Sequence, residues 1–288
     1  MKTLLILTDF SVNATYAAEY GYNLAIQMKA SIVLCNVLNV HIQLPQVDIT
    51  EWPIGGEDIS RDFCSTELMD LKKHLEYNHI SGFIPIIQGV YYTGTVEEVI
   101  AHTIKNYKVD MIVMGISQSG SLRNVIFSNH NTMMIAQTTV PLLLVPPAVS
   151  DTKIQRIAFA TDLKYIEVDL KYIYALITFA KLVNADILII NIGDAHQPSP
   201  AAFQQKEKLL TRISNEADYP HIYYKFSNDI HVDAGLQLLC NTENISILSV
   251  VPRRRNLLES LIKPSITRKL IKNLSIPLLV FPQINIET

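Results

Sequence analysis

Short apolar runs alternate with longer helix-period segments along the chain. In the first half, the apolar runs predict buried strands at residues 4–8, 31–37, 83–88, 111–114 and 141–145. Patterns with the period of an α-helix lie between them, at residues 17–28, 67–77, 96–107 and within 115–137. Strands that alternate with helices predict a mostly parallel, doubly wound α/β sheet with helices on both faces.

The second half of the chain repeats the first. The segment around Asp9 matches the segment around Asp162, the run ending at Asn36 matches the run ending at Asn191, and Pro141 matches Pro277. A repeat of about 150 residues is the size of a domain, not of a solenoid unit. We therefore expect two tandem Rossmann-like domains, residues 1–149 and 150–288, each with a five-stranded parallel sheet. The first half carries additional residues, which we place at 41–61.

Composition narrows the functional classes. The chain has 288 residues, of which 49% are hydrophobic and 18% charged, and this balance predicts a globular protein with a sizeable core. A net charge of -3 argues against a broad nucleic-acid surface. No apolar run is long enough for a membrane span or for a signal sequence. The three widely spaced cysteines and the scattered histidines predict neither disulfides nor a metal site. We expect a cytoplasmic protein.

Candidate ligand residues follow the predicted strands. In open parallel sheets, ligands bind beyond the carboxyl ends of the strands, where the strand order reverses. Asp9 follows the first strand, Val37 ends the second, and Gly115 follows the fourth. Asp9 could accept hydrogen bonds from ribose hydroxyls or from a base amino group. The alternative is that Asp9 caps the following helix, where aspartate is favoured.

The segment after the fourth strand carries the most specific motif. Met114 and Gly115 begin a loop of small and hydroxyl-bearing residues, which resembles the universal stress protein family, as does the opening Leu-Thr-Asp-Phe-Ser. The resemblance covers essentially the whole chain as two tandem copies. It implies five-stranded parallel α/β domains and, in nucleotide-binding members, a loop of pattern G-x2-G-x9-G-[ST] that holds the phosphates of ATP. Small residues there allow backbone N–H groups to approach the phosphates.

The resemblance implies that ATP or AMP, with Mg²⁺ accompanying the nucleotide, binds in the first domain. The residues implied are Asp9, Val37, Met114, Gly115, Ser117, Ser119, Gly120, Ser128 and Asn129. The loop departs from the family pattern, because Gln118 stands at the second glycine position, Ser128 at the third, and Asn129 at the Ser/Thr position. In the second domain no loop glycine remains. Arg253, Arg254 and Arg255 stand there instead, as either an anion clamp or a solvated loop.

The resemblance implies a stress-response sensor or interaction module, and we expect that no residue is catalytic. No nucleophile elbow or kinase signature occurs in the sequence. A scaffold that binds no nucleotide and a slow ATPase are the two alternatives. Family members dimerise through their last strand, and this chain contains that strand twice. We therefore expect an intramolecular pseudo-dimer through Val140–Val145 and Ile276–Phe281, and a further homodimer is left open.

Overall fold

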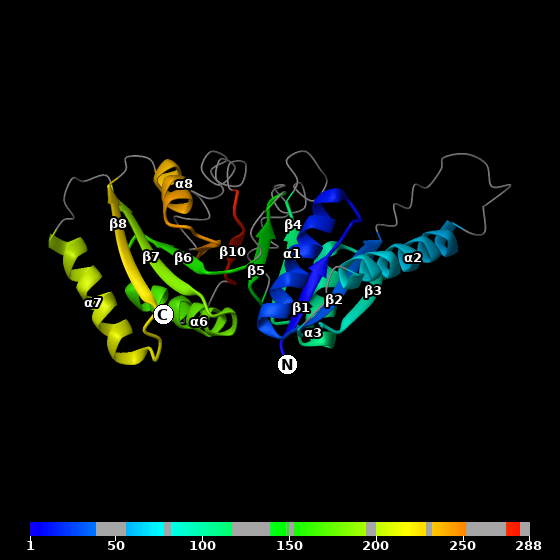
Figure 1. The fold of residues 1–288 in the computed structure, drawn as a ribbon, viewed down its shortest axis with the longest axis horizontal. Helices are drawn as coiled ribbons and strands as arrows, with labels where there is room; N and C mark the ends of the chain where they lie inside the picture. Colours follow the sequence, from blue (N-terminus) through cyan, green and yellow to red (C-terminus); the bar gives the residue numbers. More distant parts are fainter. Residues whose placement is uncertain are drawn as a thin grey trace. The chain divides into compact units, whose positions relative to one another are not determined.

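The computed structural model describes residues 1–38, 56–77, 82–116, 139–147, 149, 153–193, 200–228, 232–251 and 275–282. The chain forms two compact units, Met1–Gly115 (unit 1) and Ile116–Thr288 (unit 2), and their elements are drawn in Figure 1. Among the described residues, strands and helices alternate and the strands are mostly parallel. The predicted α/β class is therefore confirmed.

Unit 1 contains a four-stranded parallel sheet in the order β3-β2-β1-β4. Its elements are β1 (Thr3–Leu7), α1 (Val12–Met28), β2 (Ser31–Leu38), α2 (Gly56–Tyr77), β3 (Ile87–Thr93), α3 (Val96–Tyr107) and β4 (Met111–Gly115). Strand β1 lies between β2 and β4, and its Leu4, Leu5 and Ile6 are completely buried. The short apolar run in the sequence thus marks the centre of the sheet, as expected for a strand covered on both faces.

Helices cover both faces of this sheet. Successive residues of a strand point to opposite faces, and on β2 the side chain of Cys35 approaches Thr103 of α3, whereas Asn36 approaches Cys64 of α2. Helix α1 lies on the same face as α2. A Cβ atom added to Gly21 of α1 would meet Ile6 of β1, whose β2 neighbour in the register, Leu34, shares a face with Asn36.

Unit 2 contains a sheet in the order β5-β10-β9-β6-β7-β8. Its elements are β5 (Leu142–Val145), β6 (Arg156–Thr161), α6 (Ile166–Val183), β7 (Asp186–Gly193), α7 (Pro200–Glu216), β8 (Ile222–Asn228), α8 (Val232–Thr242), β9 (Ile247–Val250) and β10 (Leu278–Val280). Strands β10, β9, β6, β7 and β8 run parallel to one another. Strand β5 pairs with β10 in the antiparallel direction, with Leu143 opposite Leu279.

Two predicted elements of the first half need correction. The strand expected at 83–88 is β3, and it runs from Ile87 to Thr93. Pro85 has no N–H to donate to a ladder, and Ile84 and Ile86 are 65% and 67% exposed, not buried. Helix α2 begins at Gly56 and not near Glu67, so part of the additional segment placed at 41–61 is helical. The helix expected within 115–137 lies almost entirely outside the described residues, as does Trp52.

Candidate functional site

The carboxyl ends of β1, β2 and β4 lie at one edge of the unit 1 sheet. Leu7 is in register with Cys35 on β2 and with Met114 on β4, so the residues that follow these three positions are neighbours. The structure therefore brings together Asp9, Val37 and Gly115 at the edge where the sequence places a ligand. The strand order reverses between β1 and β4, which is the usual ligand position in such sheets.

The turn between β1 and α1 is closed by its own side chains. Thr8 Oγ1 accepts the N–H of Phe10 at 3.0 Å, and Asp9 Oδ1 accepts the N–H of Ser11 at 3.1 Å. Phe10 has a φ angle of 60°, a conformation that a bulky residue adopts only when its surroundings impose it. Ser11 is the N-cap of α1, and its Oγ accepts the N–H of Ala14 at 3.3 Å. The alternative that Asp9 caps this helix is therefore wrong.

Asp9 is exposed, in contrast to its neighbour Thr8, which is 5% exposed. One carboxylate oxygen closes the turn, and the exposed carboxylate is available to hydrogen-bond donors from solvent or from a ligand. The turn leads directly into the amino terminus of α1, where backbone N–H groups create a positive potential that favours anions. The arrangement therefore combines an acceptor for hydroxyl or amino groups with an adjacent helix terminus.

Gly115 is required by packing inside unit 1. A Cβ atom added to Gly115 would lie 2.5 Å from the carbonyl oxygen of Asn13 and 3.2 Å from the backbone nitrogen of Ala14. The end of β4 thus touches the first turn of α1, backbone to backbone. Glycine at this position brings the two elements that border the candidate site together, whether or not a ligand is bound.

The remaining predicted ligand residues divide into two groups. Met114 is completely buried and Val37 is half-buried, so a ligand at this edge would meet the backbone of Met114 and not its side chain. The other predicted residues lie outside the described residues: Ser117, Ser119, Gly120, Ser128 and Asn129. The same holds for Gln118 and for Arg253, Arg254 and Arg255 of the second half.

Asn36 is a residue of this edge that the sequence analysis did not select. Its side chain is 7% exposed, and its Nδ2 donates to the carbonyl oxygen of Thr8 at 2.8 Å. Its Oδ1 accepts from the Cys64 thiol of α2, at 3.4 Å from the sulfur. The available signal was the repeat, because Asn191 occupies the matching position of the second half.

The corresponding edge of unit 2 has the same turn. Thr161 Oγ1 accepts the N–H of Leu163 at 2.9 Å, and Asp162 Oδ1 accepts the N–H of Lys164 at 3.1 Å. Leu163 also has a φ angle of 60°, and Asn191 Nδ2 donates to the carbonyl oxygen of Thr161 at 2.9 Å. The backbone stereochemistry of the two turns is therefore closely similar.

The side chains around the two turns differ in charge. In unit 2, Lys164 stands where unit 1 has Ser11, and its ammonium group lies 3.8 Å from the Asp162 carboxylate. Helix α6 begins after Tyr165 without a side-chain cap. The buried carboxylate of Asp169, in the first turn of α6, accepts a hydrogen bond from the Thr161 hydroxyl at 2.5 Å. The unit 2 turn therefore carries a cation beside its exposed aspartate, and the unit 1 turn carries a neutral hydroxyl.

The three cysteines are buried free thiols. Burial raises the pKa of Cys35 to about 11 and that of Cys240 to about 12. Burial, assisted by the negative charge of Glu67, also raises the pKa of Cys64. All three thiols are therefore protonated at neutral pH and are poor nucleophiles. A protonated Cys64 is also the form that can donate to Asn36.

Neither a metal site nor a membrane-spanning helix is found in the described part of the chain. In that part, no three His, Cys, Asp or Glu side chains are grouped so that they could hold a metal ion. None of its helices combines the length and the apolar character needed to cross a membrane.

Comparisons with known proteins agree with this geometry. The sequence model of the universal stress protein family matches residues 1–146. A universal stress protein from Archaeoglobus fulgidus DSM 4304 superposes with a TM-score of 0.68 at 15% identity, covering 98% of this chain and 97% of that chain. A protein of unknown function from Pseudomonas aeruginosa PAO1 gives 0.60 at 12% identity, covering 98% and 92%. The cytoplasmic domain of a prokaryotic cation chloride cotransporter gives 0.53 at 10% identity, covering 98% and 95%. Among curated protein sequences, none matches. At these identities the structural matches show the fold alone.

Proposed function

The chain belongs to the universal stress protein family, and from this premise we propose that its first repeat, residues 1–149, binds an adenine nucleotide, ATP or AMP, at the carboxyl ends of β1, β2 and β4. Binding would make the chain a stress-response sensor of the cytoplasm, with no chemical step of its own. The second half of the chain would serve as a structural or interaction partner.

One observation carries this proposal. Asp9 is an exposed carboxylate at the carboxyl end of the central strand, in a turn fixed by its own hydrogen bonds, where the strand order reverses. A carboxylate in this position can accept hydrogen bonds from ribose hydroxyls or from the exocyclic amino group of adenine. The backbone around Val37 and Met114 borders the same edge. The Asp9 carboxylate could therefore bind the polar groups of a nucleoside, and the backbone around Val37 and Met114 could contact its other side.

The phosphates would lie toward the amino terminus of α1 and the loop that follows Gly115. Helix termini and hydroxyl-bearing loops are common phosphate sites. The loop residues that we propose for this role are Ser117, Ser119, Gly120, Ser128 and Asn129. Mg²⁺ would enter with the nucleotide, bound by its phosphates.

We further propose that the two repeats are domains, residues 1–149 and 150–288, with a nucleotide site in the first alone. In unit 2, the Lys164 ammonium group lies 3.8 Å from the Asp162 carboxylate, where it would compete with a nucleoside hydroxyl for this acceptor. The antiparallel pairing of β5 with β10 supports an intramolecular pseudo-dimer, because these are the last strands of the two repeats. Pairing them removes two apolar edges that would otherwise promote aggregation.

Calorimetric titration with ATP and AMP tests the proposal. We expect saturable binding to the wild type, and at least about tenfold weaker binding to Asp9→Ala, because the variant loses a charged acceptor worth roughly 1.5–3 kcal/mol. Asp162→Ala is the matched control, since it removes the same residue from the same turn of unit 2, and its affinity should stay within about twofold of the wild type. Gly115 is unsuitable for this test, because any side chain there meets the backbone of Asn13.

The two alternatives predict different results. A slow ATPase would release phosphate from ATP in proportion to protein concentration. The rate per molecule would be the same in independent purifications, unlike that of a contaminating enzyme. A scaffold would give no heat with either nucleotide at millimolar concentration. Equal affinities of the wild type and Asp9→Ala would place binding elsewhere and contradict the proposed site.

A further inference from the structure

Asn36 joins three parts of unit 1 through one buried amide group. Its Nδ2 donates a hydrogen bond to the carbonyl oxygen of Thr8 at 2.8 Å. Its Oδ1 accepts a hydrogen bond from the Cys64 thiol, with the sulfur at 3.4 Å. Thr8 in turn fixes the N–H of Phe10, the residue with the positive φ angle. The amide thus connects β2, the β1–α1 turn and helix α2.

Helix α2 contacts the turn at a second point. The ring of Phe63, the residue before Cys64, meets the ring of Phe10 edge to face, with centroids 6.3 Å apart. Phe10 is therefore contacted at two points, at its backbone N–H by Thr8 and at its ring by Phe63. The turn has few conformations open to it while α2 and Asn36 are in place.

The direction of the Asp9 carboxylate depends on this restraint. Its Oδ1 is held by the N–H of Ser11, two residues further along the same turn. If the Thr8 carbonyl is released, the positive φ angle of Phe10 loses its support, and the Asp9 carboxylate is free to turn away from the edge. A preorganised acceptor binds more tightly than one that must be ordered at the moment of binding.

We infer that Asn36 is a positioning residue of the ligand site, which holds the β1–α1 turn so that Asp9 faces the ligand and which couples this turn to α2 through Cys64. The inference rests on the proposed nucleotide site. Asn36 itself does not touch the nucleotide. A change in the position of α2 alters nucleotide affinity through Asn36, and nucleotide binding restrains α2 in return.

Isosteric substitutions test this inference. Asn36→Asp keeps the size of the side chain and removes the N–H groups that reach the Thr8 carbonyl. We expect about tenfold weaker binding of ATP in a calorimetric titration. Asn191→Asp breaks the equivalent hydrogen bond of unit 2, to the Thr161 carbonyl at 2.9 Å, and it should leave the ATP affinity within about twofold of the wild type. Equal losses in the two variants would overturn the inference, because they would indicate a general loss of folding.

A double-mutant cycle separates positioning from stability. If Asn36 acts through Asp9, adding Asn36→Asp to Asp9→Ala causes no further loss of affinity. Additive losses would contradict the inference. If Asn36→Asp does not fold, Cys64 gives a milder test: Cys64→Val removes the donor to Asn36 and should weaken ATP binding about threefold, whereas Cys64→Ser retains a donor and should bind as the wild type does. Equal affinities of these two variants would count against the coupling to α2.

A measurement without nucleotide distinguishes failure of this inference from failure of the proposed function. If the wild type binds no ATP, hydrogen exchange of peptides spanning residues 5–14 and 158–167 still reports on the two turns. Asn36→Asp should speed exchange in the first peptide and leave the second unchanged, and Asn191→Asp should do the reverse. Unchanged exchange at residues 5–14 in Asn36→Asp would refute the positioning role.

Discussion

Gly115 and Asp9 border the same edge of the unit 1 sheet, where Gly115 has a packing role and Asp9 presents an exposed carboxylate. The resemblance to nucleotide-binding loops places Gly115 in a phosphate site, whereas the structure shows its contact with the backbone of Asn13. Asp9 has one functional and one structural interpretation in the sequence. The structure assigns the cap to Ser11 and leaves the Asp9 carboxylate exposed. A sequence pattern identifies such residues because they are unusual, but it does not show which neighbour requires them.

The packing role of Gly115 leads to a stability prediction. In Gly115→Ala the new Cβ meets a backbone oxygen at 2.5 Å, so β4 and α1 must separate. We expect a loss of about 2 kcal/mol, seen as a melting temperature lower by roughly 4–8 °C. Gly89→Ala is the control, since its Cβ would meet only the Leu68 side chain at an ordinary 3.4 Å. Equal melting temperatures for Gly115→Ala and the wild type would show that the contact yields without cost.

At the scale of elements, the sequence predicts best where a local signal and the fold agree. Helix α3 was expected at 96–107 and has those bounds, because Thr95 and Glu98 form a capping box at its start. Strand β3 was misplaced because Phe83, Ile84 and Ile86 form an apolar run that the fold leaves largely outside the core. Only the pairing with β2, from Ile87 onward, decides where this strand begins. A local sequence pattern does not predict which distant segments pair as strands.

The capping box of α3 can be tested by one substitution. Thr95 Oγ1 accepts the N–H of Glu98 at 3.3 Å, and the Glu98 carboxylate accepts the N–H of Thr95 at 3.1 Å. Thr95→Ala should cost about 1 kcal/mol, a fall in melting temperature of roughly 2–4 °C. Thr66→Ala serves as the control, because Thr66 is exposed inside helix α2 and alanine is the better helix former there. A Thr95→Ala variant as stable as Thr66→Ala would contradict this account.

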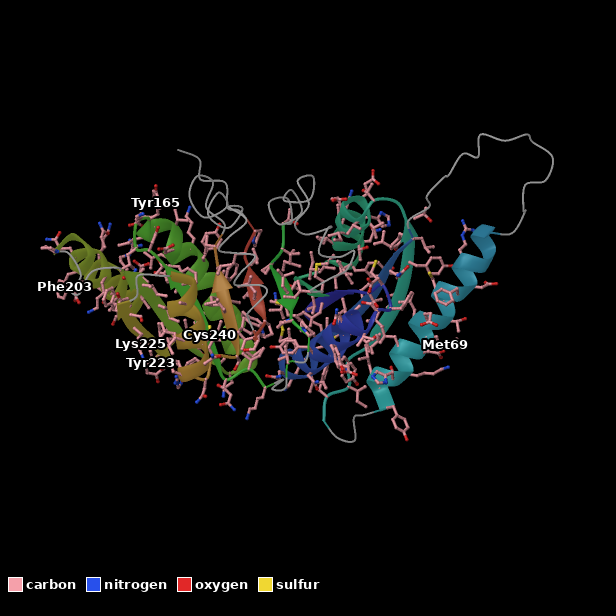
Figure 2. All side chains as sticks on the ribbon, turned by 90° about the horizontal axis from the view of Figure 1, so that it is seen from above. Met69, Tyr165, Phe203, Tyr223, Lys225 and Cys240 are labelled. Atoms are coloured by element: carbon pink, nitrogen blue, oxygen red, sulfur yellow. The ribbon has the colours of Figure 1, made fainter. Side chains whose placement is uncertain are left out.

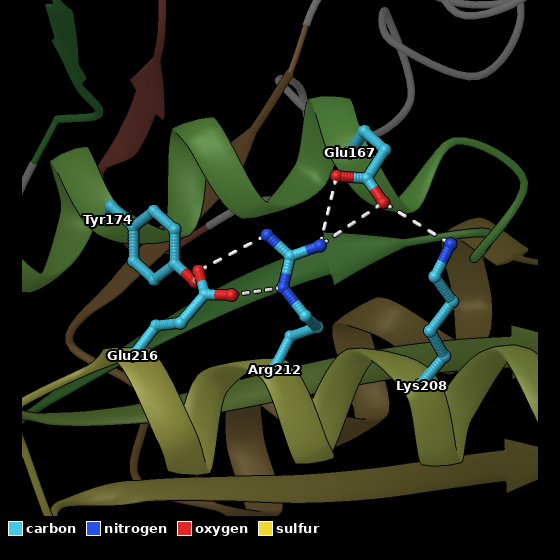
Figure 3. A network of polar contacts seen from close by, with 5 residues as sticks. All are labelled: Glu167, Tyr174, Lys208, Arg212 and Glu216. Carbon is cyan, nitrogen blue, oxygen red and sulfur yellow. Dashed lines mark hydrogen bonds and ion pairs between the residues drawn. The ribbon is translucent and has the colours of Figure 1, made fainter.

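Helices α6 and α7 are joined by a charged network, shown in Figure 3, in which Arg212 lies between Glu167 and Glu216. Hydrogen bonding to Lys208, with a smaller effect from Arg212, lowers the pKa of Glu167, and hydrogen bonding to Arg212 lowers that of Glu216. Hydrogen bonding from Tyr174 contributes at Glu216 as well. Because the pKa values are lower in the folded state, the network stabilises the protein above about pH 4.5, and this contribution is lost as pH falls through the lowered values.

Arg212→Gln should therefore flatten the dependence of stability on pH below about 4.5, measured by urea unfolding at several pH values. The effect at neutral pH should be small, because the network is exposed to solvent and screened by it. Lys73→Gln removes an isolated exposed pair with Asp70 on α2 and should leave the acid dependence unchanged. An Arg212→Gln profile that parallels the wild type would show that the network does not respond to protonation.

At the scale of the whole molecule, the sequence predicts that the chain contains two copies of one pattern. It predicts only in part how the side chains around the two equivalent turns differ. The repeat aligned Asp9 with Asp162 and Asn36 with Asn191, and the structure gives both pairs the same hydrogen bonds. The repeat also aligns Ser11 with Lys164, but the sequence alone does not show that the Lys164 ammonium group lies beside the Asp162 carboxylate. The exposure of apolar and aromatic side chains such as Met69, Phe203 and Tyr223, labelled in Figure 2, is likewise determined by tertiary packing, and a local sequence pattern does not predict it.

The central claim is that one of two similar turns binds a nucleotide, and native mass spectrometry of the chain with ATP or AMP tests it most directly by counting bound molecules. The account predicts one nucleotide per chain, lost in Asp9→Ala and retained in Asp162→Ala. Two nucleotides per chain, none, or one that is lost in Asp162→Ala instead would contradict it.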